Sequence, residues 1–218
     1  MITIGYLDEA NNPRYTFNRV FKQDFNVKML DNPELISTPD DLINQIEEMN
    51  LDVLAVDYKL ADGGWLPYNG DEVVKVIWEK KRYFPVFMLT SYPSDAMSKM
   101  ENVFLVRDKS IITDAKNSSS AENPEQSLDF LKEQIRKSVE NYKIIITKRE
   151  KRAREIEEKQ VQGLSFEEEN ELLELHMELH AIDPKANPIA PADLQTTAVK
   201  KLQEMVVASR DILKQLSK

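Results

Sequence analysis

The sequence contains no cysteine. Disulfides, cysteine metal ligands and a thiolate nucleophile are therefore excluded, and this composition is typical of proteins in a reducing compartment. The first residues, MITIGYLDEA, lack the basic start and apolar run of a signal peptide. No segment approaches the roughly 20 apolar residues that a membrane-spanning helix needs. We therefore expect a cytoplasmic protein with no membrane partner.

An excess of basic charge is also missing. Lys and Arg number 29 against 38 Asp and Glu, which gives a net charge of -9 at pH 7. Because the phosphate backbone of nucleic acid repels a negatively charged surface, we expect no nucleic-acid partner. The basic run at residues 148–154 is interrupted or followed by glutamates at intervals that suit ion pairs within one helix, so it predicts a solvated helix face.

Short apolar runs recur through the first half of the chain, and helical patterns separate them. The runs predict five strands, several of them rich in Val, Ile, Leu and Phe, as in central parallel strands. The intervening segments, such as residues 39–49 and 71–81, carry apolar residues every three or four positions and predict helices. This alternation predicts an open α/β sheet with helices on both faces. The predicted strands are residues 2–7, 27–30, 51–56, 86–89 and 103–106.

The second half of the chain has a helical pattern throughout. A polar stretch at residues 113–126 predicts a loop, and residues 127–162 predict one long helix that stops at Gly163. Ser165 and Glu168 resemble a capping box at the start of a second helix, which ends before Pro184. Apolar residues at three-four spacing then predict a last helix, at residues 199–216, and the last two helices form either a hairpin or a dimeric coiled coil. We therefore predict two domains, residues 1–120 and an all-α extension at residues 121–218.

Polar residues end the predicted strands, at the sheet edge where ligands bind in open α/β folds. Strand one is followed by Asp8 and Glu9, and strand three by Asp57. Strand four ends in Thr90, and strand five is followed by Lys109. Three carboxylates close together repel one another unless a cation offsets them, and oxygen ligands favour Mg²⁺. The central carboxylate could attack a phosphoryl donor while the metal and an ammonium neutralise the transferred group.

In this order of strands and motifs, residues 1–112 resemble the receiver domain of two-component response regulators. The acidic pair after strand one is Asp8 and Glu9, and Asp57 follows the apolar strand LDVLAV. Thr90 stands in FMLTSY, and Lys109 stands in VRDKS. The resemblance implies a flavodoxin-like (CheY-like) fold, with a five-stranded parallel sheet in the order 2-1-3-4-5.

The resemblance also implies a role for each residue. Asp57 would be the phospho-acceptor, and Thr90 and Lys109 would be the other catalytic groups. Phe104, or an aromatic residue near it, would be the rotamer switch that follows Thr90. The implied cofactor is Mg²⁺, held by Asp8, Glu9, Asp57 and the main-chain carbonyl of Lys59.

Three features depart from the family pattern, one of which is Ser91, in place of the small Ala or Gly commonly found beside the switch residue. Lys109 is followed by Ser110 where the family usually has proline, so a shifted alignment would put Arg107 in the place of the lysine. The loop after the acceptor aspartate is longer than usual and carries Trp65 and Tyr68. These aromatic side chains either cover the site, contact a partner or pack on the helix that follows.

We therefore expect a response regulator of a phosphorelay that is not an enzyme beyond its own phosphorylation and dephosphorylation. A histidine kinase or another phosphodonor protein would supply the phosphoryl group. The helical extension would signal to a downstream protein effector, either as a monomer or as a homodimer. Two alternatives stay open: a phosphate sink or relay receiver, and a pseudo-receiver that binds partners without phosphorylation.

Two other functions find little support. A haloacid-dehalogenase-like phosphatase needs a second aspartate two places after its nucleophile, where this chain has Lys59. His176 and His180 have a spacing that can bind zinc, but Glu178 is one place too late for the metalloprotease motif. A surface or partly buried histidine pair is the favoured interpretation.

Overall fold

The computed structural model describes residues 1–100, 102, 105–113, 127–189 and 206. The chain divides into two compact units, Met1–Lys143 and Ile144–Lys218. The predicted domain boundary between residues 120 and 121 lies outside the described residues. Among the helices that the structure describes, none is long and apolar enough to cross a membrane.

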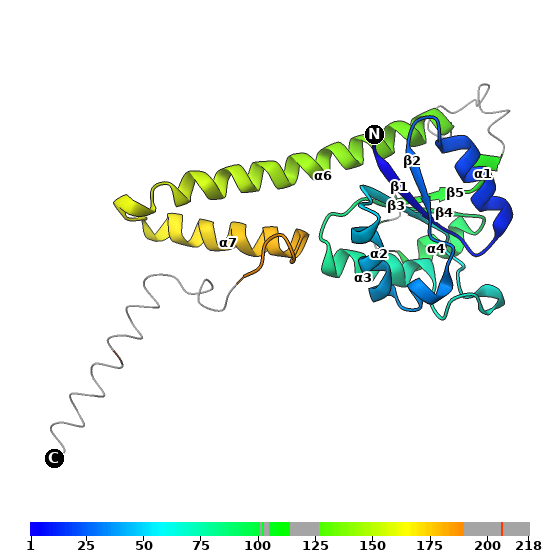
Figure 1. The fold of residues 1–218 in the computed structure, drawn as a ribbon, viewed down its shortest axis with the longest axis horizontal. Coiled ribbons are helices and arrows are strands. Elements are labelled where there is room, and N and C mark those ends of the chain that lie inside the picture. Colours follow the sequence, from blue (N-terminus) through cyan, green and yellow to red (C-terminus); the bar gives the residue numbers. More distant parts are fainter. Residues whose placement is uncertain (101, 103–104, 114–126, 190–205, 207–218) are drawn as a thin grey trace, which may run out of the picture. The chain divides into compact units, whose positions relative to one another are not determined.

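The first unit is built on one sheet of five parallel strands in the order β2-β1-β3-β4-β5 (Figure 1). Strands β3 and β4 are buried at every position, which explains their unbroken apolar sequence. The predicted fold class, a CheY-like α/β sheet followed by helices, is thereby confirmed. The strands are β1 (Thr3–Leu7), β2 (Asn26–Met29), β3 (Val53–Val56), β4 (Val86–Thr90) and β5 (Val106–Asp108).

Helices cover both faces of this sheet. Successive side chains of a strand point to opposite faces, so each strand contributes to two separate apolar clusters. Leu54 and Val56 of β3 belong to one apolar cluster, and Val53 and Ala55 belong to the other. The first cluster includes residues of α2 (Pro39–Glu48), α3 (Gly70–Lys80) and α4 (Pro93–Lys99). The second includes residues of α1 (Asn11–Phe21), α5 (Ser110–Thr113) and the first part of α6 (Leu128–Glu157). Short 3₁₀ helices η1 (Pro33–Ile36) and η2 (Asp62–Gly64) lie in the connections.

The first part of α6 is an integral layer of the first unit. Its residues Leu131, Ile135 and Val139 are buried in the cluster on the α1 face of the sheet. Burial of apolar side chains of this size contributes about 1.5–3 kcal/mol each. This part of the helix therefore completes the core of the receiver-like unit.

The second unit contains the end of α6, a short 3₁₀ helix η6 (Gln160–Gln162) and α7 (Phe166–Ile182). The capping box predicted at Ser165 and Glu168 is present at the start of α7. Gly163 has a φ of 90°, a backbone conformation that favours glycine and reverses the chain between the two helices. The last helix predicted from the sequence, at residues 199–216, lies outside the described residues apart from position 206.

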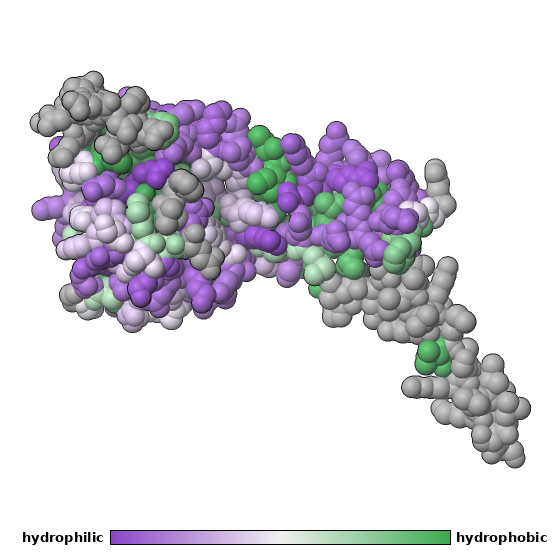
Figure 2. All heavy atoms as spheres, turned by 180° about the vertical axis from the view of Figure 1, so that it is seen from behind, coloured by the Kyte–Doolittle hydropathy of each residue, from purple (hydrophilic) through white to green (hydrophobic). Residues whose placement is uncertain are grey.

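The surface of the described residues is mostly polar. On the face drawn in Figure 2, hydrophilic side chains predominate and the hydrophobic patches between them are small. This distribution agrees with the high proportion of charged residues, 31% of the chain.

Candidate functional site

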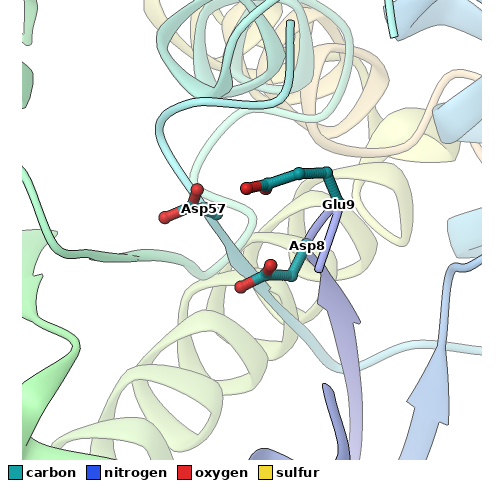
Figure 3. A group of neighbouring side chains, drawn as sticks. All are labelled: Asp8, Glu9 and Asp57. Carbon is teal, nitrogen blue, oxygen red and sulfur yellow. The ribbon is translucent and has the colours of Figure 1, made fainter. Parts of the chain in front are cut away.

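Three carboxylates meet at the carboxyl ends of β1 and β3. Leu7 pairs with Val56 in the parallel register, so the residues that follow each strand emerge side by side. Asp8, Glu9 and Asp57 each place a carboxylate oxygen within 4.8 Å of the others (Figure 3). Asp8 is 0% exposed and Asp57 is 3% exposed. Two buried carboxylates at this distance require compensating positive charge.

Gly70 determines how closely the start of α3 approaches the chain that follows β3. Its N–H donates to the carbonyl oxygen of Tyr58 at 2.8 Å. A Cβ atom at position 70 would lie 2.3 Å from the main-chain oxygen of Asp57. Only glycine fits this approach without displacing the backbone that carries Asp57.

Lys109 supplies positive charge between two of the carboxylates. Its Nζ lies 2.8 Å from Oδ2 of Asp8 and 3.0 Å from Oδ1 of Asp57. Burial by itself lowers the pKa of Lys109, but the carboxylates of Asp57 and Asp8 outweigh burial and raise that pKa above its usual value. Lys109 is therefore an ammonium ion at neutral pH.

Arg107, the other candidate for this position, lies elsewhere. Its guanidinium donates to Oε1 of Gln134 at 3.0 and 3.3 Å and to the carbonyl oxygen of Val106 at 3.0 Å. Lys109 directly follows β5, and its N–H donates to the Thr90 carbonyl oxygen at 2.9 Å. This main-chain hydrogen bond to β4 fixes the backbone from which the lysine side chain extends. The structure thus brings Lys109, and not Arg107, to the carboxylates.

Asp8 has a further partner that sequence analysis missed. The hydroxyl of Tyr6 donates to Oδ2 of Asp8 at 2.5 Å, and the N–H of Ala10 donates to Oδ1 at 2.9 Å. Burial, and then the nearby Asp8 carboxylate, raise the pKa of Tyr6 above its usual value. The sequence did contain a signal for this contact. A tyrosine stands two places before Asp8 in an otherwise apolar strand, and positions two apart share a strand face.

The Glu9 carboxylate has an oxygen that is available to bind a cation. Its Oε2 is buried and has no hydrogen-bond partner among the described residues. Burial is the main reason that the pKa of Glu9 is raised to about 7; Asp8 and Asp57 add to this, while a main-chain hydrogen bond and Lys109 oppose it. An unpartnered buried carboxylate oxygen fits a cation ligand.

The donor set fits Mg²⁺. When all three carboxylates are ionised, as metal ligands are, a single ammonium leaves two negative charges uncompensated within this group. Mg²⁺ prefers hard oxygen ligands of this kind. The N–H of Lys59 donates to Oδ2 of Asp57 at 3.2 Å, so the main chain at position 59 also reaches the site. That the Lys59 carbonyl binds the metal stays a prediction.

A pocket of about 260 Å³ opens beside these groups. Residues from four chain segments line it, among them Glu9, Asp57, Lys59, Tyr92 and Lys109. The ammonium of Lys59 lies 3.7 Å from the centre of the Tyr92 ring, and both residues line the pocket. Such a pocket has room for a phosphoryl group next to Asp57.

Thr90 lies at the end of β4 and is 0% exposed. Its hydroxyl oxygen accepts a hydrogen bond from the N–H of Tyr92 at 3.1 Å. Ser91 and Tyr92 line the pocket, and Thr90 is not among its lining residues. Phe104, the predicted switch residue, lies outside the described residues.

The aromatic side chains of the long loop pack in two different ways. Tyr68 is buried, and its hydroxyl donates to the carbonyl oxygen of Ile36 at 2.6 Å. Trp65 is partly buried against the core and has the Arg14 guanidinium 5.6 Å from its ring centre. Neither aromatic lines the pocket beside Asp57.

The two histidines have separate partners. Nε2 of His176 lies 3.0 Å from Oε1 of Glu157, and Nδ1 of His180 lies 2.8 Å from the carbonyl oxygen of Asn187. Within the described residues the pair forms part of no cluster of metal ligands, since the group that meets that description is Asp8, Glu9 and Asp57.

No family model matches the chain, and no curated protein matches it. Solved structures of the Salmonella typhimurium RcsB response regulator are similar to it. One, described as showing conformational dynamism for DNA interaction, has 14% identity and a TM-score of 0.40, and covers 85% of this chain and 98% of that chain. A second, RcsB from Salmonella enterica serovar Typhimurium bound to promoter P1flhDC with phosphomimetic BeF3-, has 13% identity, a TM-score of 0.36, and coverages of 88% and 95%.

These neighbours correct one expectation, that nucleic acid is excluded as a partner. The RcsB structures are described in terms of DNA interaction, and one contains promoter DNA. The expectation rested on the net charge of -9, which is a property of the whole chain. A protein of negative net charge can carry a local basic surface, so net charge does not exclude such a partner.

Proposed function

We propose that this chain is a response regulator whose first unit accepts a phosphoryl group on Asp57 in the presence of Mg²⁺. The observation that carries the proposal is the position of Lys109. Its ammonium lies within 3.0 Å of Asp57 and 2.8 Å of Asp8, beside a pocket that Glu9 also lines. Phosphoryl transfer to an aspartate requires a nucleophilic carboxylate and cations that neutralise the transferred group, and here Lys109 supplies an ammonium while Glu9 offers an unpartnered oxygen to a metal ion.

The proposed transfer forms an acyl phosphate. A carboxylate oxygen of Asp57 bonds to phosphorus while the bond from phosphorus to the donor atom breaks, and the donor keeps the electron pair. With a phosphohistidine donor, the leaving group is the imidazole nitrogen. Bound Mg²⁺ would neutralise negative charge on the transferred group, with Asp8, Glu9 and Asp57 as its ligands.

Lys109 and Thr90 have distinct roles in this scheme. The Lys109 ammonium would move from its carboxylate partners to an oxygen of the transferred group. The Thr90 hydroxyl, which accepts from Tyr92 N–H through its oxygen, would donate its own hydrogen to another phosphoryl oxygen. Both movements change contacts at the ends of β4 and β5, which is how phosphorylation would alter the surface presented to a partner.

The proposal includes a cytoplasmic location, a histidine kinase or another phosphodonor protein upstream and a protein effector downstream. The proposed protein catalyses no reaction other than its own phosphorylation and dephosphorylation. The charged surfaces of α7 and of the end of α6 would carry the output by protein contacts. A phosphate sink and a non-phosphorylated pseudo-receiver remain the competing functions.

Phosphorylation with a small donor tests the proposal. The full chain is incubated with acetyl phosphate, with and without Mg²⁺, and its intact mass is measured. We expect the wild type and Asp71→Asn to gain one phosphoryl mass only with Mg²⁺, and Asp57→Asn to gain none. Asp71 is a suitable control because it is an acidic residue near the start of α3 that does not line the pocket.

The competing functions predict different results. A wild-type chain that stays unmodified with acetyl phosphate and with a neighbouring kinase would contradict the proposal and favour the pseudo-receiver. Reconstitution with that kinase and its second receiver separates the other two functions. A phosphate sink shortens the phosphorylated lifetime of the second receiver, whereas a regulator with its own output does not.

A further inference from the structure

Tyr6 is a polar residue in a central strand, and the proposed chemistry gives it no role. It is 0% exposed and lies within β1, two places before Asp8. Its hydroxyl donates to Oδ2 of Asp8 at 2.5 Å. A buried phenol needs a hydrogen-bond acceptor, and here the acceptor is a carboxylate of the candidate metal site.

The ring of Tyr6 is held by aromatic packing. It stacks on Phe17 of α1 with the ring centres 4.0 Å apart and the planes 6° from parallel. Phe17 in turn stacks on Phe21 at 4.2 Å, and Phe21 contacts Phe25 at 5.7 Å. Because these rings are almost completely buried, the Tyr6 hydroxyl has one fixed position relative to the sheet.

Asp8 therefore receives donors from three directions. Tyr6 and Lys109 donate to Oδ2, and the N–H of Ala10 donates to Oδ1. The Lys109 ammonium is shared with Asp57, so it is the donor most easily displaced when charge in the site changes. The Tyr6 hydroxyl and the Ala10 N–H are the contacts that fix the plane of the Asp8 carboxylate.

We propose that Tyr6 is a positioning residue, which holds the Asp8 carboxylate in the orientation that binds a divalent cation together with Glu9 and Asp57. This inference rests on the proposed function, because it concerns the same Mg²⁺ site. Hydrogen bonds to metal-ligating groups typically account for a 10–100-fold difference in metal affinity. Tyr6→Phe keeps the stacked ring and removes the hydroxyl alone, so we expect it to weaken Mg²⁺ binding about 10-fold.

The binding experiment compares three full-length proteins by calorimetric titration with Mg²⁺. Phe25→Leu is the matched control, because Phe25 is 1% exposed, its ring contacts Phe21 in the same row of aromatic rings, and the polar partners of the Asp8 side chain are Tyr6, Ala10 and Lys109. We expect Phe25→Leu to lower the unfolding midpoint at least as much as Tyr6→Phe does, yet to leave Mg²⁺ affinity unchanged. A loss of affinity in both variants would show that core destabilisation is the cause, and would overturn the proposal.

A second readout needs no metal. The chain is labelled with 3-fluorotyrosine, and the ¹⁹F resonance of position 6 is assigned by its loss in Tyr6→Phe. We expect Asp8→Asn to shift this resonance, and Asp71→Asn to leave it in place. An unchanged resonance in Asp8→Asn would mean that the hydroxyl does not contact the carboxylate, which would also overturn the proposal.

The outcomes separate this inference from the proposed function. If the wild type binds Mg²⁺ and Tyr6→Phe binds it equally well, the positioning role is wrong and the proposed function stands. If the wild type binds no Mg²⁺, both are wrong. If only Tyr6→Phe binds weakly and Asp8→Asn shifts the position 6 resonance, the role of Tyr6 is supported.

Discussion

Lys109 Nζ lies 2.8 Å from Oδ2 of Asp8, although the two residues are 101 positions apart in the chain. Parallel pairing of the strands brings them together, since β1 and β5 both end at the same edge of the sheet. Both side chains are buried, so each depends on the other for compensation of its charge.

Replacing Lys109 with methionine should destabilise the metal-free protein. The change leaves the carboxylates of Asp8 and Asp57 buried without their cation, and removing one partner of a buried ion pair costs about 3–5 kcal/mol. Urea unfolding of the wild type and Lys109→Met measures this loss. The double variant Lys109→Met with Asp8→Asn should recover part of the stability, and a single variant as stable as the wild type would contradict the interpretation.

Gly70→Ala should disturb the backbone at Asp57, the proposed phospho-acceptor. The added Cβ would lie 2.3 Å from the main-chain oxygen of Asp57, and backbone atoms cannot rotate away as a side chain can. Overpacking of this kind costs about 1–3 kcal/mol. We expect lower stability in urea together with slower phosphorylation by acetyl phosphate. Lys75→Ala on the exposed side of α3 is the control, and equal stability of Gly70→Ala and the wild type would refute the predicted clash.

Asp24 should make the packing of the first part of α6 within the first unit sensitive to acid. Its carboxylate lies 2.7 Å from Nζ of Lys132 and 2.8 Å from a guanidinium nitrogen of Arg136. The hydrogen bond from Lys132 is the main reason that the pKa of Asp24 lies below its ordinary value of 3.8, and Arg136 adds to it. A carboxyl with a lowered pKa stabilises the fold above its unfolded pKa, and this stabilisation is lost as the pH falls through the folded pKa.

Asp24→Asn tests this dependence. We expect the variant to be less stable than the wild type by about 1 kcal/mol at neutral pH and low salt, as is usual for ion pairs near the surface. The difference should shrink as the pH falls below 3.8, and should also shrink in high salt. Unfolding followed by far-UV circular dichroism at several pH values measures it. A difference that persists in strong acid would rule out the carboxylate charge as its source.

The ion pairs between the end of α6 and α7 should contribute to the stability of the second unit. Arg152 reaches Glu171 through two parallel contacts of 2.6 and 2.7 Å, the geometry that favours arginine with a carboxylate. Glu171→Arg places like charges together and should lower the thermal midpoint. The charge-swapped double variant, Arg152→Glu with Glu171→Arg, should restore most of it. Equal midpoints in the single and double variants would mean that the pair contributes nothing.

Much of the fold follows from local sequence patterns. The unbroken apolar runs of β3 and β4 predict central parallel strands, because strands covered on both faces need apolar side chains at every position. The positions of Asp8, Glu9 and Asp57 at strand ends predict that their carboxylates meet, because parallel strands share one carboxyl edge. The start of α7 after Gly163 and its end before Pro184 were also predicted, because the capping interactions at Ser165 involve residues only a few positions apart.

Other features depend on contacts between residues far apart in the chain. The sequence allowed either Arg107 or Lys109 at the carboxylates, because both follow the predicted strand at residues 103–106. In the structure Arg107 lies within β5 and Lys109 directly follows it, so the register of the strand decides which one reaches the carboxylates. The first part of α6 has an ordinary amphipathic pattern, and only the cluster with Leu131 and Ile135 shows that it completes the sheet layer. The sequence does not distinguish Tyr6 from other aromatic residues. Only the structure shows that its ring stacks on Phe17 and that its hydroxyl contacts Asp8.

The sequence by itself determined most of the strands and helices, and that an acidic pair and a central aspartate end two of the strands. The last strand was predicted at residues 103–106, whereas β5 comprises Val106–Asp108. The tertiary structure alone decided which cation compensates these carboxylates and which hydroxyl holds Asp8. Secondary-structure patterns arise from neighbours a few positions apart, so local sequence is enough to predict them. Side-chain partners such as Lys109 and Tyr6 are selected by the register of strands and the packing of buried rings, which exist only once the chain has folded.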